Sequence, residues 1–393
     1  MISACFVTLL LYLAGESRRL RRALRRVPLR VAVTGTRGKS GVTRLIAAGL
    51  RDSGARVLAK TTGSRPALIL PDGTEQEFPR RGGPPSIREQ IRLAGLAAGL
   101  KADALVVEMM SVGEECLLTE SRRILRPGVL ALTNVRLDHV DVMGRSREDI
   151  ARTLCAAFPE SARVFFPAEE SYPVFEEAAA RLGARLEPVS EKIGEAAAVP
   201  FGEFEPNVRL ALAVLESLGV ERGRALEAMS RALPDFGRLR LWTVPFGTPP
   251  RTALCASAFA ANDPESSAAA LERIKTMLPA RPRPLVGLLC LREDRGDRTL
   301  QWIQAAGAGF FGEFERVAVV GGPARAAVRK LGGVVGVGIT KFSYFANPLP
   351  EDLMDKMVAP EARERLVVGL GNIVGPGESI VRYWEDVGRP LDR

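Results

Sequence analysis

A glycine-rich turn near the N-terminus constrains the fold more than any other feature. The segment VTGTRGKS, residues 33–40, follows an apolar β-branched run at 29–34 and precedes a helix-like pattern. Glycines let backbone N–H groups turn around phosphate oxygens, Lys39 brings charge to the outer phosphates, and the Ser40 hydroxyl is suited to magnesium. The sequence therefore predicts a phosphate loop inside an α/β nucleotide-binding domain.

Short β-rich runs alternate with helix-like stretches along the rest of the chain. The clearest predicted strands are residues 29–34, 55–60, 102–109 and 128–135, and then 252–258, 283–290, 316–322 and 365–371, after a turn-rich break at 234–238. This alternation is typical of βαβ units with mostly parallel sheets. We predict an α/β chain in three parts: an N-terminal apolar helix (1–27), a P-loop parallel-sheet ATP-binding domain (28–237) and a Rossmann-like C-terminal domain (238–393).

The N-terminal segment combines an apolar run with many arginines. Residues 2–14 are nearly all apolar, and residues 16–30 contain seven arginines and one glutamate. A secretory signal has the reverse order, and the apolar run is short of the roughly 20 residues that cross a bilayer. We expect a helix that anchors the chain to the cytoplasmic face of the cell membrane, because arginines stay inside and attract anionic lipids. The alternative is an amphipathic helix packed on the domain or on a partner subunit.

Charge, cysteines and histidine exclude several classes of function. The net charge is +9, and the arginine-rich segment has a surplus of six positive charges. No basic stripe interleaved with aromatic residues occurs elsewhere, so nucleic acid is not an expected partner. The five cysteines lie far apart without CxxC spacing, which predicts reduced core residues instead of disulfides or a zinc site. The single histidine, His139, excludes chemistry that needs two histidines.

Two further segments place polar side chains where predicted strands end. Glu108 ends the apolar strand LVVE, and TNVRLDHVD at 133–141 follows the next one. Because the carboxyl ends of parallel strands meet at one edge of a sheet, Ser40, Glu108 and His139 should surround one crevice. Such a site suits magnesium that bridges ATP phosphates. The alternatives are a strand-end carboxylate paired with an arginine for Glu108 and a structural role for His139.

These motifs resemble those of the Mur ligase superfamily. Val33 stands where the common phosphate loop has glycine, and the variant TGTxGKS is the form found in Mur ligases. The resemblance implies catalytic roles for Lys39, Glu108, His139 and Arg238, and metal binding by Ser40, Glu108 and His139. It also implies that nucleotide is bound by Gly35, Thr36, Arg37, Gly38, Lys39, Ser40, Gly41, Asn134, Asn207, Arg238, Asn262 and Asp263.

Within this superfamily the chain is most similar to the ligase subunit of poly-γ-glutamate synthase (the PgsB/CapB type). The phosphate loop begins about 33 residues from the start, so the substrate domain that precedes it in cell-wall Mur ligases is not expected. Folylpolyglutamate synthase shares this two-domain plan, but the N-terminal apolar stretch and the segments 61–73 and 369–377 resemble the poly-γ-glutamate enzyme more closely.

The resemblance implies an ADP-forming ligase that phosphorylates the γ-carboxyl of glutamate, or of the growing chain, and joins it to another glutamate amine. Expected partners are ATP, Mg²⁺, glutamate or poly-γ-glutamate, and membrane subunits of a polymer synthase or export complex; homo-oligomerisation is left open. The alternatives are a folylpolyglutamate synthase-like or other Mur-type amino-acid ligase, a P-loop ATPase or kinase, and an assembly factor that binds nucleotide only for structure.

One departure from the family concerns a second metal ion. Many Mur ligases use a carbamylated lysine shortly after the histidine motif, but no lysine occurs between Lys101 and Lys192. Arginine does not replace a carbamate. A second ion would therefore depend on His139, Glu108 and water.

Overall fold

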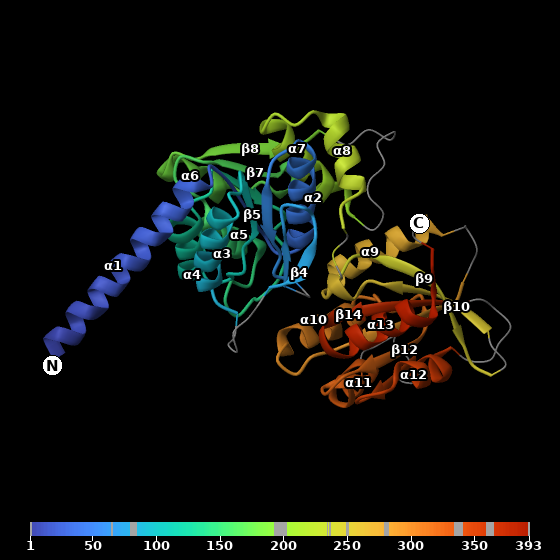
Figure 1. Cartoon of the computed structure of the whole chain (residues 1–393). Helices are drawn as coiled ribbons and strands as arrows, with labels where there is room; N and C mark the ends of the chain where they lie inside the picture. The colour runs from blue at the N-terminus through green and yellow to red at the C-terminus, as the bar shows by residue number, and fades with distance from the viewer. Residues whose placement is uncertain are drawn as a thin grey trace. The chain divides into compact units, whose positions relative to one another are not determined.

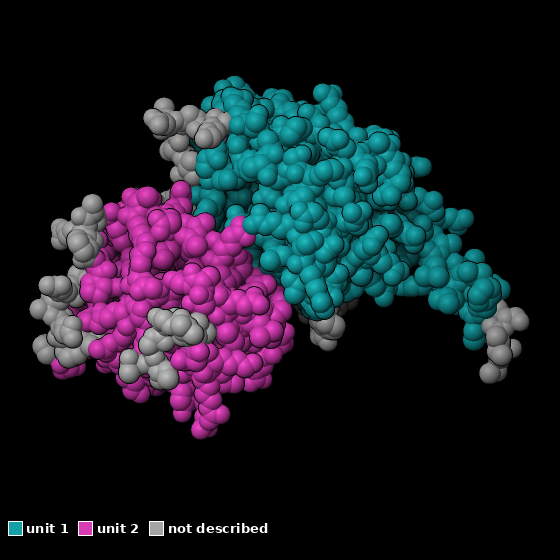
Figure 2. Space-filling view, turned by 180° about the vertical axis from the view of Figure 1, so that it is seen from behind, with its two compact units in different colours: residues 1–235 teal, residues 236–393 magenta. Residues whose placement is uncertain are grey.

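The computed structural model describes residues 2–63, 66–78, 85–191, 203–233, 235, 237–248, 251–278, 283–333, 341–358 and 365–391. The chain divides into two compact units, residues 1–235 (unit 1) and residues 236–393 (unit 2), which Figure 2 distinguishes by colour. Each unit is an α/β body with its own sheet (Figure 1).

Unit 1 contains an eight-stranded sheet within its described residues. The strands are β1 (Leu29–Thr34), β2 (Val57–Lys60), β3 (Ala67–Ile69), β4 (Glu75–Glu77), β5 (Ala104–Glu108), β6 (Val129–Leu132), β7 (Arg163–Pro167) and β8 (Arg185–Val189). The helices are α1 (Ile2–Arg26), α2 (Lys39–Asp52), α3 (Arg88–Gly99), α4 (Glu114–Leu118), the π-helix η1 (Thr119–Leu125), α5 (Arg147–Leu154), α6 (Pro173–Leu182), α7 (Glu205–Ser217) and α8 (Arg222–Ser230). Short 3-10 turns lie at Cys155–Ala157 and Ala168–Glu170.

The strand order in unit 1 is β4-β3-β2-β5-β1-β6-β7-β8, and all pairs are parallel except β2–β3 and β3–β4. The central strand β1 is buried on both faces, which explains its continuous apolar sequence. Val31 and Val33 join a core with α2, α7 and α8, whereas Ala32 joins the core on the opposite face with α3, α5 and α6. This two-sided packing fixes the carboxyl ends of β1, β5 and β6 side by side.

Unit 2 contains a seven-stranded sheet within its described residues, in the order β13-β12-β11-β14-β10-β9-β15. The strands are β9 (Arg240–Phe246), β10 (Arg251–Ser257), β11 (Leu285–Cys290), β12 (Phe314–Val320), β13 (Phe342–Phe345), β14 (Leu366–Gly371) and β15 (Arg389–Pro390). The helices are α9 (Pro264–Met277), α10 (Gly296–Gly307), α11 (Ala324–Gly332), α12 (Pro350–Met357) and α13 (Glu378–Val387), with a 3-10 turn at Phe259–Ala261. The short segment η6 (Ile373–Gly377) leads into α13 and has a non-helical backbone at Val374 and Gly375.

The five strands from β13 to β10 are parallel, and β9 and β15 continue the sheet as antiparallel neighbours. Trp242 on β9 and Trp384 on α13 pack together at 5.8 Å between ring centroids and close this end of the core. Strand β9 was not predicted, because Pro245 interrupts its apolar pattern. Among the described residues β15 pairs only with Trp242 and Thr243, so β9 has β10 on one side at Pro245 and is an edge on the other, where proline is tolerated.

All eight predicted strands are present: the strand at 29–34 matches β1 at both ends, and the ends of the others differ by at most three residues. A mixed α/β fold with two parallel-rich sheets is therefore confirmed. Turn signals explain the shifts. For example, the predicted strand at 128–135 ends at Leu132, because Thr133 and Asn134 already turn toward the phosphate loop.

The predicted membrane anchor at the N-terminus is wrong. Residues 2–26 do form one helix, α1, but no helix among the described residues has the length and the apolar character to cross a bilayer. The apolar run at 2–14 extends only about 20 Å at 1.5 Å per residue, and arginines occupy the rest of the helix. The basic half packs against α3, with Leu24 buried and Arg88 paired with Glu16. The prediction of a chain held at the membrane by this helix is thereby overturned.

Candidate functional site

The phosphate loop connects β1 to α2 and is packed tightly by two other segments. Gly35 and Gly38 adopt positive φ angles of 118° and 78°, which side chains rarely allow. A Cβ atom on Gly35 would meet the Thr133 hydroxyl, and one on Gly38 would lie 2.6 Å from Asn207 Nδ2. The glycines are therefore required both by the backbone turn and by the close approach of residues that follow β6 and begin α7.

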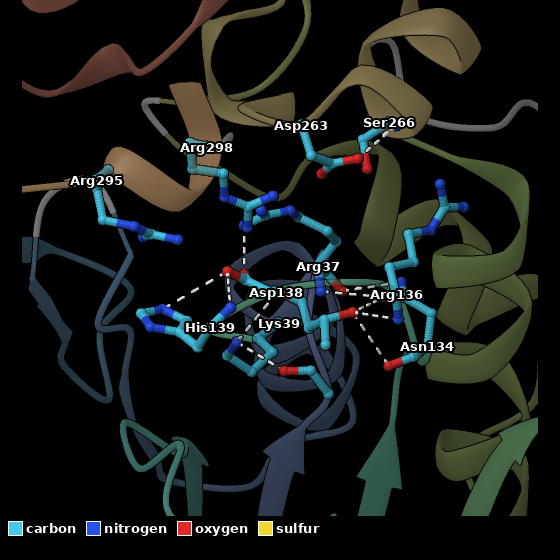
Figure 3. Close-up of polar contacts among 12 residues, drawn as sticks. Arg37, Lys39, Asn134, Arg136, Asp138, His139, Asp263, Ser266, Arg295 and Arg298 are labelled. Carbon is cyan, nitrogen blue, oxygen red and sulfur yellow. Dashed lines mark hydrogen bonds and ion pairs between the residues drawn. The ribbon is translucent and has the colours of Figure 1, made fainter. Parts of the chain in front are cut away.

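Asn134 holds the loop through its side-chain amide (Figure 3). Its Oδ1 accepts hydrogen bonds from Thr36 Oγ1 at 2.7 Å and from the Arg37 backbone N–H at 3.0 Å. Its Nδ2 donates to the Arg37 carbonyl at 3.1 Å. Both ends of one amide thus fix the central residues of the loop, and a ligand meets a loop that is already ordered.

Lys39 is the first residue of α2 and folds back over the loop. Its Nζ donates to the Gly35 carbonyl at 2.8 Å and approaches the Thr36 carbonyl at 3.4 Å. Burial lowers the pKa of Lys39 below its ordinary value, while the carboxylates of Glu108 and Asp138 act in the opposite direction. The ammonium therefore lies at the helix N-terminus, where phosphate oxygens are also favoured.

Glu108 and Ser40 form a direct pair at the carboxyl ends of β5 and the loop. Ser40 Oγ donates to Glu108 Oε2 at 2.8 Å, and the Thr62 backbone N–H donates to the same oxygen at 2.6 Å. A Cβ atom on Gly63 would lie 2.5 Å from Ser40 Oγ, so the turn after β2 covers this pair closely. Glu108 is only 3% exposed. Within the described residues its hydrogen-bond donors are a hydroxyl and a backbone N–H, which argues against the alternative of an arginine pair at Glu108.

Asp138 and His139 face the phosphate loop from the turn after β6. Asp138 Oδ2 lies 3.1 Å from Arg37 Nη1, and its Oδ1 accepts from the His139 backbone N–H at 2.8 Å. His139 Nε2 lies 3.7 Å from the same carboxylate, and the residue has a positive φ of 44°. Figure 3 shows the imidazole, Asp138 and Lys39 gathered on one side of the loop. A positive φ is uncommon for a residue other than glycine, and such residues often lie at functional sites.

Gly41 and Asn207 complete the set in unit 1. Gly41 lies in the first turn of α2, where a Cβ atom would come within 2.8 Å of Glu203 Oε2. Asn207 is buried in the first turn of α7 and packs on Gly38. The residues predicted from 35–41, 108, 134, 139 and 207 are therefore brought together at one edge of the sheet.

The other predicted residues belong to unit 2. Asn262 precedes α9 with a positive φ of 21°, and Asp263 caps this helix by accepting from the Ser266 backbone N–H at 2.9 Å. Arg238 lies before β9 and is half-buried. All three residues belong to unit 2, and their roles at the site remain predictions.

Sequence reasoning missed several residues of the site. Thr62 and Gly63 contact Glu108 and Ser40, and Glu120 is a fully buried carboxylate that accepts from Gln90 Nε2 at 2.7 Å and from the Ser111 backbone N–H at 3.0 Å. Glu120 thus fixes the turn that leaves β5 just after Glu108. Its only signal in the sequence is an acidic residue inside a helical segment, which by itself predicts a solvated surface.

Known proteins resemble the chain over nearly its whole length. It is 30% identical to the capsule biosynthesis protein CapB of Bacillus anthracis over 97% of this chain and 82% of the relative. The chain belongs to the CapB family. Within this family, the PGA synthase CapB of Bacillus subtilis (strain 168) is 28% identical, with 97% of this chain and 96% of the relative covered.

Domain models and solved structures agree with this membership. Residues 33–193 of this CapB-family chain match the Mur ligase middle domain, and residues 243–387 match the poly-gamma-glutamate synthase CapB C-terminal domain. Among solved structures, Escherichia coli FolC in complex with DHPP and ADP is 20% identical with a TM-score of 0.68, covering 94% of this chain and 91% of that one. MurF from Acinetobacter baumannii is 14% identical with a TM-score of 0.64, covering 95% and 79%. These likenesses show that the fold is that of Mur-type ligases.

Proposed function

We propose that this chain is an ATP-dependent amide ligase that joins glutamate through its γ-carboxyl and so makes poly-γ-glutamate. Family membership supports the reaction, because the matching relatives carry the names capsule biosynthesis protein and PGA synthase. The observation that carries the proposal is the gathering of Lys39, the Ser40–Glu108 pair and the Asp138–His139 pair around one glycine loop.

ATP would bind along this loop with its phosphates at the N-terminus of α2. Backbone N–H groups at this end and the Lys39 ammonium would hold the phosphate oxygens, and Asn134 keeps the loop in shape. Asn207, beside Gly38, is our candidate for contact with the base. The solved Mur-type neighbours include complexes with ADP and with AMPPNP and a Mn ion, which supports nucleotide use by this fold.

The donor atoms fit magnesium. Ser40 Oγ and Glu108 Oε2 lie 2.8 Å apart, and both are oxygen ligands of the kind that magnesium prefers. The described residues hold no group of three or more His, Cys, Asp and Glu suited to a metal. When bound, the ion would withdraw charge from the transferring phosphoryl group. His139, with Glu108 and water, is the candidate set for a second ion.

The proposed reaction has two steps. First, an oxygen of the γ-carboxylate bonds to the terminal phosphorus of ATP, and the bond between this phosphorus and the bridging oxygen breaks. ADP is the leaving group, and the product is an acyl phosphate. The amine nitrogen of another glutamate then bonds to the acyl carbon, phosphate leaves, and the nitrogen loses a proton. Lys39 stabilises charge that develops on the phosphoryl oxygens, and Asp138, held by Arg37, orients the His139 turn.

We propose that residues 28–237 form the ATP-binding domain and that residues 238–393 form a Rossmann-like ligase domain. Arg238, Asn262 and Asp263 would act from the second domain on the nucleotide. Partner subunits of a polymer synthase and homo-oligomerisation stay predictions.

One assay tests the proposal. The purified chain is incubated with ATP, Mg²⁺ and single amino acids, and ADP release is measured beside amide formation, with hydroxylamine as a trap for the acyl phosphate. We expect glutamate to stimulate ADP release and to form a γ-amide. ADP release that is unchanged by every amino acid would favour an ATPase, and amide formation only when a folate is supplied would favour the folylpolyglutamate reaction.

A further inference from the structure

A buried arginine links the phosphate-loop helix to the end of unit 1. Arg44 lies on α2, one helical turn after Ser40 and on the same side, and is only 6% exposed. Arginine is almost never buried to this degree unless its charge is paired. The partners of Arg44 therefore show what this helix is tied to.

Arg44 has carboxylate partners from two segments that are far away in sequence. Its guanidinium pairs with Glu75 on β4, with Nη2 3.2 Å from Glu75 Oε2. Its Nε lies 3.6 Å from Asp235 Oδ1, and its Nη1 lies 3.5 Å from the Leu233 carbonyl. Burial lowers the pKa of Arg44, and Asp235, Glu108 and Glu203 oppose this shift. One side chain thus holds a strand at the sheet edge and the last described residues of unit 1.

The two carboxylates differ in the part of the chain to which they connect Arg44. Glu75 belongs to β4, at the edge of the sheet, away from the loop in strand order. Asp235 is the last residue of unit 1, and the chain enters unit 2 at the next position. Arg238 follows three residues later, a chain length of at most about 11 Å.

We propose that Arg44 is a positioning residue that ties the crossing between the two units to the phosphate-loop helix through Asp235. Phosphates that settle on the first turn of α2 restrain this helix, and the Arg44–Asp235 pair passes the restraint to the segment that leads to Arg238. The proposal rests on the proposed function, because it gives nucleotide binding a consequence for the segment that carries Arg238.

Four variants separate this role from general stability. Asp235→Asn removes the charge at the crossing, and Arg44→Lys keeps a charge but loses the planar fork. Glu75→Gln weakens the pairing on β4 only. Asp52→Asn is the matched control, because Asp52 lies at the other end of α2 and pairs with Arg224 and Arg231 on the surface.

The main measurement is hydrogen exchange of the segment 233–241 with and without AMPPNP and Mg²⁺. We expect the nucleotide to slow exchange in the wild type, in Glu75→Gln and in Asp52→Asn, and to lose this effect in Asp235→Asn and Arg44→Lys. In the ligase assay, Asp235→Asn should lower kcat about tenfold while the Kd for AMPPNP changes less than about threefold.

Several results would overturn the proposal. In the first, nucleotide does not change hydrogen exchange of residues 233–241 in the wild type. In the second, nucleotide slows exchange in Asp235→Asn as much as in the wild type. In the third, Glu75→Gln loses the slowing by nucleotide as Asp235→Asn does. If Asp235→Asn does not fold, Arg44→Lys is judged by the same readouts. A wild type that forms no amide with any amino acid would end the proposed function instead, whereas hydrogen exchange would still decide the role of Arg44.

Discussion

The two sheets have the same parallel architecture but very different carboxyl edges. In unit 1 this edge joins segments that are far apart in sequence, since the Ser40 hydroxyl donates to the Glu108 carboxylate and Arg37 forms an ion pair with Asp138. In unit 2 the corresponding edge holds ion pairs between near neighbours in sequence, Arg292–Asp294 and Arg295–Asp297 after β11, beside buried neutral groups. Ser257 Oγ, Ser267 Oγ and Asn372 Nδ2 have no hydrogen-bond partner within the part of the chain that the structure describes. Fixed charges around a phosphate-binding loop suit phosphoryl transfer, so we expect this chemistry in unit 1.

The largest expected effect comes from removing charge at the edge of unit 1. Lys39→Met and Glu108→Gln should each lower kcat/KM by about 10²–10³-fold, because each removes a group that stabilises charge in the transition state. Amide formation and ADP release measure the loss. Lys356→Met, on the exposed face of α12 in unit 2, is the control and should retain activity. If the Lys39 and Glu108 variants have normal activity, the hypothesis that unit 1 carries the catalytic groups is rejected.

A smaller effect is expected when the order of the loop, and not its charge, is disturbed. Asn134→Ala removes the amide that holds Thr36 and Arg37, and should weaken ADP binding by about tenfold. Titration calorimetry gives the Kd. Because no charge is lost, kcat at saturating ATP should fall less than in Lys39→Met. Unchanged affinity would mean that the loop is ordered by its glycines alone.

A buried serine in each unit allows the stability contribution of its hydroxyl to be compared between the units. Ser121 in unit 1 donates to the Ala157 carbonyl at 2.6 Å, whereas the equally buried Ser267 hydroxyl in unit 2 has no hydrogen-bond partner among the described residues. Ser121→Ala should lower the free energy of unfolding by about 1–3 kcal/mol, because a buried carbonyl loses its donor. Ser267→Ala should change it by less than about 1 kcal/mol. Urea unfolding measures both. A large loss in Ser267→Ala would show that this hydroxyl is satisfied after all.

The sequence was sufficient where chemistry depends on local geometry. Gly35, Lys39 and Glu108 were predictable because a strand-turn-helix motif and a strand end each lie within a few residues. Thr62 and Arg44 were not predictable from the sequence. Glu108, the partner of Thr62, is 46 residues away, and Asp235, a partner of Arg44, is 191 residues away, so these pairs form only in the folded chain. The membrane anchor failed for a different reason. It was predicted from a short apolar run followed by arginines, but no helix among the described residues is long and apolar enough to cross a bilayer.

The smallest expected effect concerns the cysteines, which again differ between the units. Cys5 and Cys116 in unit 1 are exposed, whereas Cys155 in unit 1 and Cys255 and Cys290 in unit 2 are buried. Burial raises the pKa of Cys155 from 9.0 to about 12 and raises those of Cys255 and Cys290 as well. At pH 8 iodoacetamide should therefore label only Cys5 and Cys116 in the native chain, because alkylation needs the thiolate.

The same pKa shift fixes the direction of a pH effect on folding. A thiol whose pKa is raised by folding contributes its full stability below its unfolded pKa and loses it as pH rises, here between 9 and about 12. Labelling of Cys155, Cys255 and Cys290 should thus begin only as alkaline pH loosens the cores, and peptide mass spectrometry across that range follows each site. Equal labelling of all five cysteines at pH 8 would show that neither core excludes solvent as described, and labelling of Cys255 and Cys290 before Cys155 would make unit 2 the less stable of the two.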